Sequence, residues 1–502
     1  MGASVVLLLL VGWSRPNAAQ PDLAPSGWAP GTPVPLTLSP AAVTAVLWAA
    51  YVLGALGVWL GLRTRPTALL TWWLPVGLGV LALLAAPFGS ADHVNYLAYG
   101  RILDQGGDPW LESPGTWAGG ADPVTSRVEA PWTEEPSIYG PFATALHGLA
   151  AAVGGDSLRQ GVWVWQLLVV IAWLGVRALL RPVLGEGSRG RLDVLWTLNP
   201  LVLGVGVLGA HVDVIASALA VAAVVAAARW RGVGGALLAG AVAGLALCTK
   251  VTYAVVLVGL LAAWWLAARS ATHDGAPRSR PGPNPLARML WLAVGVVAVS
   301  LPLHLWAGPH VYDQLGRSRQ AVSLATPWRL VLEALAPHLG GPTTRTLIAV
   351  GAAGLAVVLA WLLLRLSRAD TGLPGDDALS ARPVAATALW VTACLGLAYS
   401  LAAPYSLPWY DVLVWSALPA LLPGVVDLVA LGRLLVVACA YVPGRVLGMT
   451  PAVERLTLGF RRRVAPWLLL GLWAAVIAVG VRRGSRPTPG PPRGGGTPTP
   501  TR

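Results

Sequence analysis

The chain has 502 residues, of which 56% are hydrophobic and only 11% are charged. Soluble domains contain about 25% charged residues, so this composition excludes a soluble protein and indicates an integral membrane protein. In a soluble protein the net charge of +13 would suggest a nucleic-acid partner. Here the arginines lie in short loops between apolar segments, as the positive-inside rule requires, so no nucleic-acid binding is expected.

Apolar segments of about 20 residues, the length that crosses a bilayer as a helix, recur along the chain. Residues 1–14 have no basic start and no clear cleavage site, so we interpret them as a shortened first membrane helix in preference to a signal peptide. The proline-rich segment 15–39 is predicted to be an external loop. Further spans are predicted at 40–62, 68–88, 161–181, 192–209, 212–229, 233–249, 251–268, 289–307, 343–365, 384–402, 412–430, about 432–448 and 464–481.

These spans predict an all-α polytopic membrane protein with about thirteen transmembrane helices. The segment 141–154 is apolar but too short to span, and we expect a half-helix there. Arg63 and Arg65 place the turn after the span 40–62 in the cytoplasm, so the segment 89–141 is a large external loop. The tail 482–502 is rich in proline, glycine and arginine and is expected to be disordered and cytoplasmic.

The external loop 89–141 is polar and contains eight of the 22 acidic residues of the chain. Acids gathered in one part of a membrane protein indicate a functional site. Asp92 follows the apolar run that ends at Phe88, so it lies at the edge of the membrane. Partial desolvation there would raise its pKa toward that of a general base. The alternative is a solvated acid at a helix end.

Several other polar side chains reach the same external side from separate helix pairs. His93 follows Asp92, but adjacent residues do not share a helix face, so a joint role does not follow. His211 and Asp213 occupy a turn between two spans, where they either bond to the backbone or line a polar cavity. Lys250 is the only lysine in the chain. It either reaches to lipid headgroups or binds a phosphate.

Aromatic residues accompany these groups near the predicted outer boundary. Tyr139, Trp409 and Tyr410 either belong to an interfacial aromatic belt or stack on sugars. His147, on the half-helix, is interpreted as interfacial. Arg317 and Arg319 are second candidates for a phosphate contact. The sequence contains no Walker A, GxSxG or HExxH motif, and a lipid-linked donor fits an external site better than a nucleotide does.

The segment ADHVNYLAYGRILDQGGDPW resembles the first external loop of actinobacterial polyprenol-phosphate-mannose-dependent α-1,6-mannosyltransferases of the GT-C superfamily. The resemblance continues through EEPSIYGPF, LNPLVLGVGVLGAHVDVIASAL, ALCTKVTYAVVL and LPWYDVLVW, and so covers most of residues 85–420. It implies one GT-C-like transmembrane domain over residues 1–481, with a catalytic loop at 89–141. It also implies inverting transfer of mannose from polyprenyl-phosphate-mannose to a growing α-1,6-mannan, the core of lipomannan and lipoarabinomannan, outside the plasma membrane.

In this resemblance Asp92 matches the general base, Lys250 a basic position and His211 with Asp213 a His-x-Asp turn. The family often has an acidic pair where this chain has Asp92 and His93, so we predict no metal and no cofactor. Two alternatives stay open. One is another GT-C enzyme, such as an arabinofuranosyltransferase with a decaprenyl-phosphate donor, and the other is a lipid or glycan transporter.

Overall fold

The computed structural model describes residues 1–64, 70–230, 232–273, 284–318, 320–370, 382–445 and 447–484. Within these ranges the chain forms helices and no β-strand. Nine of the described helices are long and apolar enough to cross a membrane. The predicted all-helical polytopic architecture is confirmed, whereas the count of about thirteen spans is not.

The helices follow one another along the whole described chain. Their bounds are α1 (Gly2–Trp13), α2 (Pro40–Thr64), α3 (Trp73–Leu83), α4 (Asp92–Asp104), α5 (Pro141–Gly154), α6 (Leu158–Leu180), α7 (Glu186–Leu192), α8 (Pro200–Val202), α9 (Val212–Arg229), α10 (Val233–Thr249), α11 (Val255–His273), α12 (Pro285–Ala307), α13 (Asp313–Ser318), α14 (Trp328–Leu339), α15 (Gly341–Leu366), α16 (Arg382–Ala402), α17 (Val412–Ala417), α18 (Val425–Ala440), α19 (Pro451–Gly459) and α20 (Ala465–Gly484). The half-helix predicted at 141–154 is present as α5.

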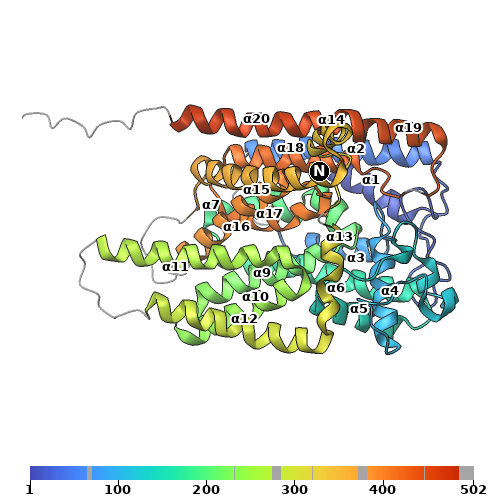
Figure 1. Ribbon diagram of the computed structural model, residues 1–502, viewed down its shortest axis with the longest axis horizontal. Coiled ribbons are helices and arrows are strands. Elements are labelled where there is room, and N and C mark those ends of the chain that lie inside the picture. Colours follow the sequence, from blue (N-terminus) through green and yellow to red (C-terminus); the bar gives the residue numbers. More distant parts are fainter. Residues whose placement is uncertain are drawn as a thin grey trace, which may run out of the picture.

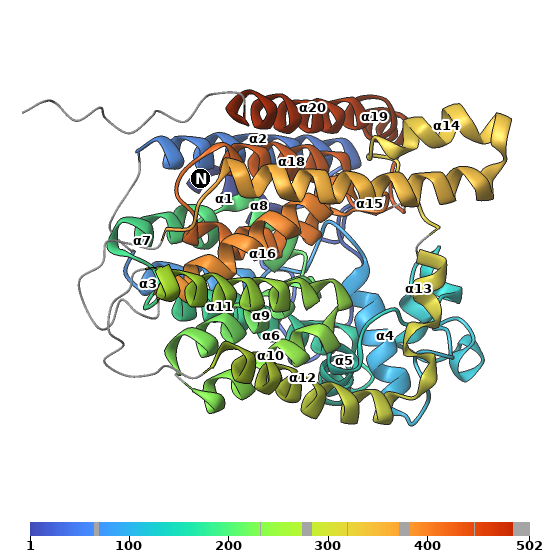
Figure 2. The ribbon, with the colours of Figure 1, turned by 60° about the vertical axis from the view of Figure 1, so that its left-hand side comes forward.

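Most long helices run along the long axis of the molecule, and α4 with the loops that follow it lies toward the right-hand end in Figure 1. In Figure 2, α10, α11 and α12 form one group, whereas α2, α15, α18 and α20 form another on the opposite side. Asp92, the first residue of α4, therefore lies toward the right-hand end of the helical bundle in Figure 1.

Several predicted spans differ in the structure: α1 and α10 are shorter than a span, and α18 ends at Ala440, before the predicted end at about residue 448. The segment 68–88 contains only α3, which is too short to span. The single helix predicted at 412–430 is wrong, because α17 ends at Ala417 and α18 begins only at Val425. Pro419 and Pro423 have no backbone N–H for a continuous helix. Of the predicted tail, residues 485–502 lie outside the described residues.

The break after α17 is held by backbone pairing with another segment. The amide of Asp370 donates to the carbonyl of Ala420 at 2.8 Å, and the amide of Leu422 donates to that of Arg368 at 3.0 Å. The broken helix therefore keeps its backbone groups bonded inside the protein, as a membrane protein requires.

In the loop 89–141, which is predicted to be external, some of the acids build turns. The Asp122 carboxylate accepts bonds from the amides of Val124 and Thr125, both at 2.9 Å, and from Arg101 at 3.0 Å. Because Arg101 is on α4, this acid ties the loop to the helix that begins at Asp92. Some of the acids gathered in this loop are thus structural.

Helix α4 crosses α5 at close range through Gly100. A Cβ atom added at Gly100 would lie 2.2 Å from the carbonyl oxygen of His147, which is backbone and cannot move aside. We expect Gly100→Ala to destabilise the protein by about 1–3 kcal/mol, measured by thermal unfolding in detergent. Gly175→Ala on α6 is the matched control, since nothing lies within 4 Å of its added Cβ. Equal stability of the two variants would contradict the tight crossing.

Candidate active site

Helix α4 begins at Asp92, and the face that contains this residue lines a cavity. Asp92, Asn95 and Tyr99 are spaced i, i+3 and i+7, so they lie on one helical face. All three line a cavity of about 230 Å³, which we call the Asp92 cavity. The Asp92 side chain is 17% exposed, and its backbone amide bonds to the hydroxyl of Ser90 at 3.3 Å.

His93, the neighbouring candidate, does not line the Asp92 cavity. Its ring is completely buried, and neither ring nitrogen has a hydrogen-bond partner among the described residues. Burial lowers the pKa of His93 to about 3, so the ring is neutral. The proposed substrate contact of His93 therefore has no support in this geometry.

His211 contacts the Asp92 carboxylate and is held by several neighbours. Its Nδ1 atom lies 3.5 Å from Asp92 Oδ2 and 3.4 Å from the Tyr96 hydroxyl, and its Nε2 atom lies 3.2 Å from the Ser90 hydroxyl. The ring stacks on Trp409 at a centroid distance of 3.7 Å. Burial lowers the pKa of His211 well below its usual value, so His211 is a neutral partner for Asp92.

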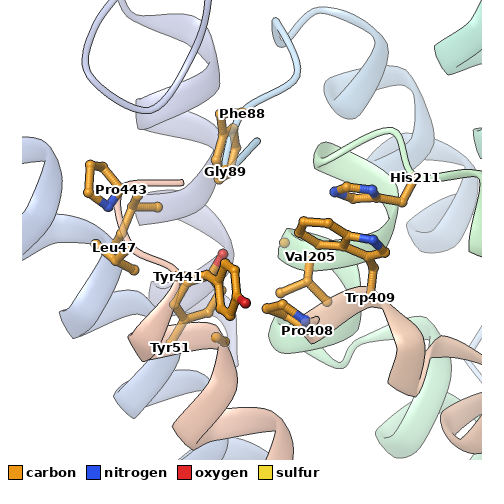
Figure 3. Close-up of a pocket in the computed structure, with 13 residues that line it drawn as sticks. Leu47, Tyr51, Phe88, Gly89, Val205, His211, Pro408, Trp409, Tyr441 and Pro443 are labelled. Carbon is orange, nitrogen blue, oxygen red and sulfur yellow. The ribbon is translucent and has the colours of Figure 1, made fainter. Parts of the chain in front are cut away.

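Figure 3 shows His211 stacked on Trp409, with Phe88, Tyr51 and Tyr441 on the other side of a small space. This space is about 20 Å³, enough for one water molecule. Trp409 also lines the Asp92 cavity. Its ring therefore separates the Asp92 cavity from this small space. The same ring stacks on His211 and holds it in place.

The Asp92 carboxyl is suited to exchange a proton near neutral pH. Burial raises the pKa of Asp92 from 3.8 to about 7, while the charge of Lys250 opposes this rise and that of Asp213 adds to it. A general base is most effective when its pKa lies near the working pH. The local environment thus gives Asp92 the acid–base property that its position at the membrane edge predicted.

Lys250 and Asp213 form an ion pair, which the sequence did not indicate. The Lys250 ammonium donates to Asp213 Oδ1 at 2.7 Å and lies 3.9 Å above the centre of the Tyr410 ring. The Tyr253 hydroxyl donates to the backbone carbonyl of Asp213 at 2.9 Å. Asp213 is 1% exposed and Lys250 is 17% exposed, so Asp213 orients a cation that reaches the cavity surface.

A second cavity, of about 500 Å³, adjoins the Asp92 cavity. We call it the α15 cavity, because Ala349, Ala352, Ala353 and Ala356 of α15 line it. Their spacing places these small side chains on one face of the helix. The two cavities share the residues Ile138, Tyr139, Lys250, Ala321, Tyr405 and Tyr410. Lys250 therefore lies at the junction between a cavity that contains an acid and one that is mainly apolar.

The structure brings together seven of the eight candidates, and it adds others that the sequence reading missed. The candidates at or beside the two cavities are Asp92, Tyr139, His211, Asp213, Lys250, Trp409 and Tyr410. Asn95 and Tyr99 were missed, although their spacing from Asp92 on a helix would have indicated them. His147 is buried and stacks on Tyr96 at 4.8 Å, so its interfacial assignment is wrong. The side chains of Arg317 and Arg319 lie outside the described set.

The Pro408–Asp411 turn that carries Trp409 is fixed by a buried ion pair beneath the site. Asp411 pairs with Arg433 of α18, and Arg433 also donates to the hydroxyl of Ser406. Both charged side chains are 1% exposed. A buried pair of this kind is costly to break, so it holds the turn, and with it the Trp409 ring, in one position.

Relatives of known name match parts of the chain. "Alpha-(1->6)-mannopyranosyltransferase A" of Mycobacterium tuberculosis is 27% identical over 224 residues, which cover 41% of this chain and 40% of that protein. "Alpha-(1->6)-mannopyranosyltransferase B" of Corynebacterium glutamicum is 30% identical over 126 residues, or 24% of this chain and 20% of that protein. Each match thus spans less than half of the relative's length.

One similar solved structure is that of ArnT from Cupriavidus metallidurans, bound to undecaprenyl phosphate. It is 15% identical, covers 86% of this chain and 77% of its own, and has a TM-score of 0.37. A family model described as "Alpha-(1->6)-mannopyranosyltransferase, N-terminal domain" matches residues 3–269. Because this match covers more than half of the 502 residues, the chain belongs to the alpha-(1->6)-mannopyranosyltransferase family.

Proposed function

We propose that this protein is a membrane mannosyltransferase that transfers mannose from polyprenyl-phosphate-mannose to an α-1,6-mannan acceptor at the external face of the plasma membrane. The acceptor class is the mannan core of lipomannan and lipoarabinomannan. One observation carries the proposal: Lys250 lies at the junction of the Asp92 cavity and the mainly apolar α15 cavity. Membership of the mannopyranosyltransferase family supports the choice of sugar.

The α15 cavity suits the first isoprenoid units of a lipid donor. Its alanine-lined wall leaves room for a branched apolar chain, and burial of such a chain is favourable by roughly 25 cal/mol per Å² of apolar surface. The lipid phosphate would then lie at the Lys250 ammonium, which the Asp213 carboxylate orients from the opposite side. The mannosyl group would extend past Tyr139 and Tyr410 into the Asp92 cavity.

The reaction needs one base and one stabilised leaving group. The Asp92 carboxylate takes the proton from the acceptor hydroxyl as the hydroxyl oxygen attacks the anomeric carbon. The bond from that carbon to the phosphate oxygen breaks, and polyprenyl phosphate leaves with inversion at the anomeric centre. The Lys250 charge stabilises the departing phosphate. Neutral His211 lies beside Asp92 and keeps its carboxylate in place without adding a competing charge.

The proposal is tested with the purified full-length protein in detergent. We would incubate it with labelled polyprenyl-phosphate-mannose and synthetic α-1,6-mannosides, then map the linkage of the labelled product. The expected result is an acceptor extended by one α-1,6-linked mannose. Labelling from decaprenyl-phosphate-arabinose in place of the mannosyl donor would contradict the donor assignment. With the same protein reconstituted into lipid vesicles, movement of an intact donor across the membrane without a glycosylated product would contradict transferase activity.

The activity should depend on pH through the Asp92 carboxyl. Because burial raises the pKa of Asp92 to about 7, most of the carboxyl is protonated below that pH and cannot accept the acceptor's proton. We expect kcat/KM for transfer to rise about tenfold per pH unit below the pKa and to level off above it. A profile between about pH 5 and 9 measures this, and a flat profile would contradict the role of Asp92 as base.

A further inference from the structure

We infer that Asn95, Trp132 and Glu135 form a binding site for the terminal sugar of the acceptor. All three line the Asp92 cavity, and none of them lines the α15 cavity. The inference rests on the proposed function and adds to it the part of the site that selects the acceptor. In this arrangement the α15 cavity holds the lipid of the donor, and the acceptor sugar meets the mannosyl group in the Asp92 cavity.

Asn95 is the observation that points most directly to a ligand. Its side chain is only 5% exposed, and its Oδ1 atom has no hydrogen-bond partner among the described residues. A buried amide oxygen without a partner is unfavourable, so native proteins rarely leave one unused. Asn95 lies one helical turn after Asp92 and on the same face. A sugar hydroxyl next to the one that reacts would donate to Asn95 Oδ1 while Asp92 accepts the transferred proton.

Trp132 supplies an apolar surface at the rim of the cavity. It belongs to the short 3-10 turn Trp132–Glu134 of the external loop, and its ring is partly buried. A tryptophan ring is large, rigid and apolar on its face, so it can pack against the C–H face of a pyranose. This contact favours a sugar ring over a linear polar molecule.

Glu135 adds a carboxylate on the same rim. The Tyr99 hydroxyl donates to the backbone carbonyl of Glu135 at 2.9 Å, which joins this part of the loop to the helix face that contains Asp92 and Asn95. A carboxylate has about four lone-pair sites, so it can accept from sugar hydroxyls in addition to its contacts within the protein. Its neighbour Glu134 is exposed and does not line either cavity. The chemistry that fits this rim is a neutral pyranoside with one apolar face and several hydroxyls.

The test compares the two substrates in the full-length purified protein. For Asn95→Ala we expect the KM for a synthetic octyl α-1,6-dimannoside to rise about three- to tenfold, from loss of a neutral hydrogen bond. For Trp132→Ala we expect a rise of roughly tenfold, from loss of the aromatic surface. The KM for polyprenyl-phosphate-mannose should stay within about twofold in both variants, because neither side chain lines the α15 cavity.

The matched controls come from the same loop. Glu134→Gln is compared with Glu135→Gln, and Trp117→Ala with Trp132→Ala, since neither Glu134 nor Trp117 lines the Asp92 cavity. Trp132→Phe should recover most of the acceptor affinity. Thermal unfolding confirms that each variant is folded. An unchanged acceptor KM in folded Asn95→Ala and Trp132→Ala would overturn the acceptor site. A wild-type protein that transfers no mannose would instead overturn the proposed function.

Discussion

Replacing Asp92 with asparagine should lower mannosyl transfer by about 10²- to 10⁴-fold, the usual contribution of a general base. Asparagine keeps the shape of the side chain beside His211 but cannot accept the acceptor's proton. Burial raises the pKa of Asp92 to about 7, so the folded protein disfavours the ionised form. Removing the charge should therefore not lower thermal stability above that pH. The measurement is initial transfer rate with labelled donor and α-1,6-mannoside, together with thermal unfolding.

The matched control for this prediction is Asp104→Asn. Asp104 lies at the C-terminal end of the same helix, is exposed and does not line the cavity. Its variant should transfer mannose at the wild-type rate. If folded Asp92→Asn retained a rate within about threefold of the wild type, another group would have to be the base.

Replacing Lys250 with methionine should produce the second large effect. The leaving phosphate would lose its cation, for which we expect a fall of about 10²- to 10³-fold in kcat/KM. Methionine retains an unbranched apolar side chain of similar length. The variant should also be less stable by about 3–5 kcal/mol, because Asp213 is left buried without its partner. Transfer assays and thermal unfolding measure the two effects separately.

The double variant Lys250→Met with Asp213→Asn separates catalysis from folding. It removes both charges of the pair, so stability should return toward that of the wild type, while transfer should stay low. Recovery of transfer in the double variant would contradict the phosphate-binding role of Lys250. Lys250 is also the only lysine of the chain, so an amine-reactive reagent can label it at a known position. Polyprenyl phosphate should protect it from that reagent.

The pairing of Lys250 with Asp213 shows why the contacts within the site could not be predicted from the sequence. Arginine placement predicts that both residues lie on the external side, and this prediction requires only hydropathy and charge counts. Their contact at 2.7 Å depends on how α9 packs against α10, which no local pattern contains. The same holds for Asp92 and His211, whose residue numbers differ by more than a hundred and whose side chains meet at 3.5 Å.

His93 and Asn95 show that nearness to Asp92 in the sequence does not by itself place a side chain in the cavity. Both lie near Asp92 in the sequence, and histidine is the more familiar functional residue, so the sequence reading chose His93. Once α4 is known to begin at Asp92, helical spacing favours Asn95 and turns His93 to another face. The local geometry, and not the reactivity of the residue type, decides which neighbour reaches the cavity.

The sequence by itself determined the class of this protein. Its low charge and long apolar segments predicted a polytopic helical protein, and the arginine clusters predicted that Asp92, His211, Lys250 and Trp409 share one side. Only the tertiary structure decided that the helix predicted at 412–430 breaks between α17 and α18, that Asp122 builds a turn of the loop, and that Lys250 lies at the junction of two cavities. The physical reason is that membrane insertion depends on summed hydropathy along a segment. Cavities and ion pairs depend instead on packing between helices that are distant in the chain.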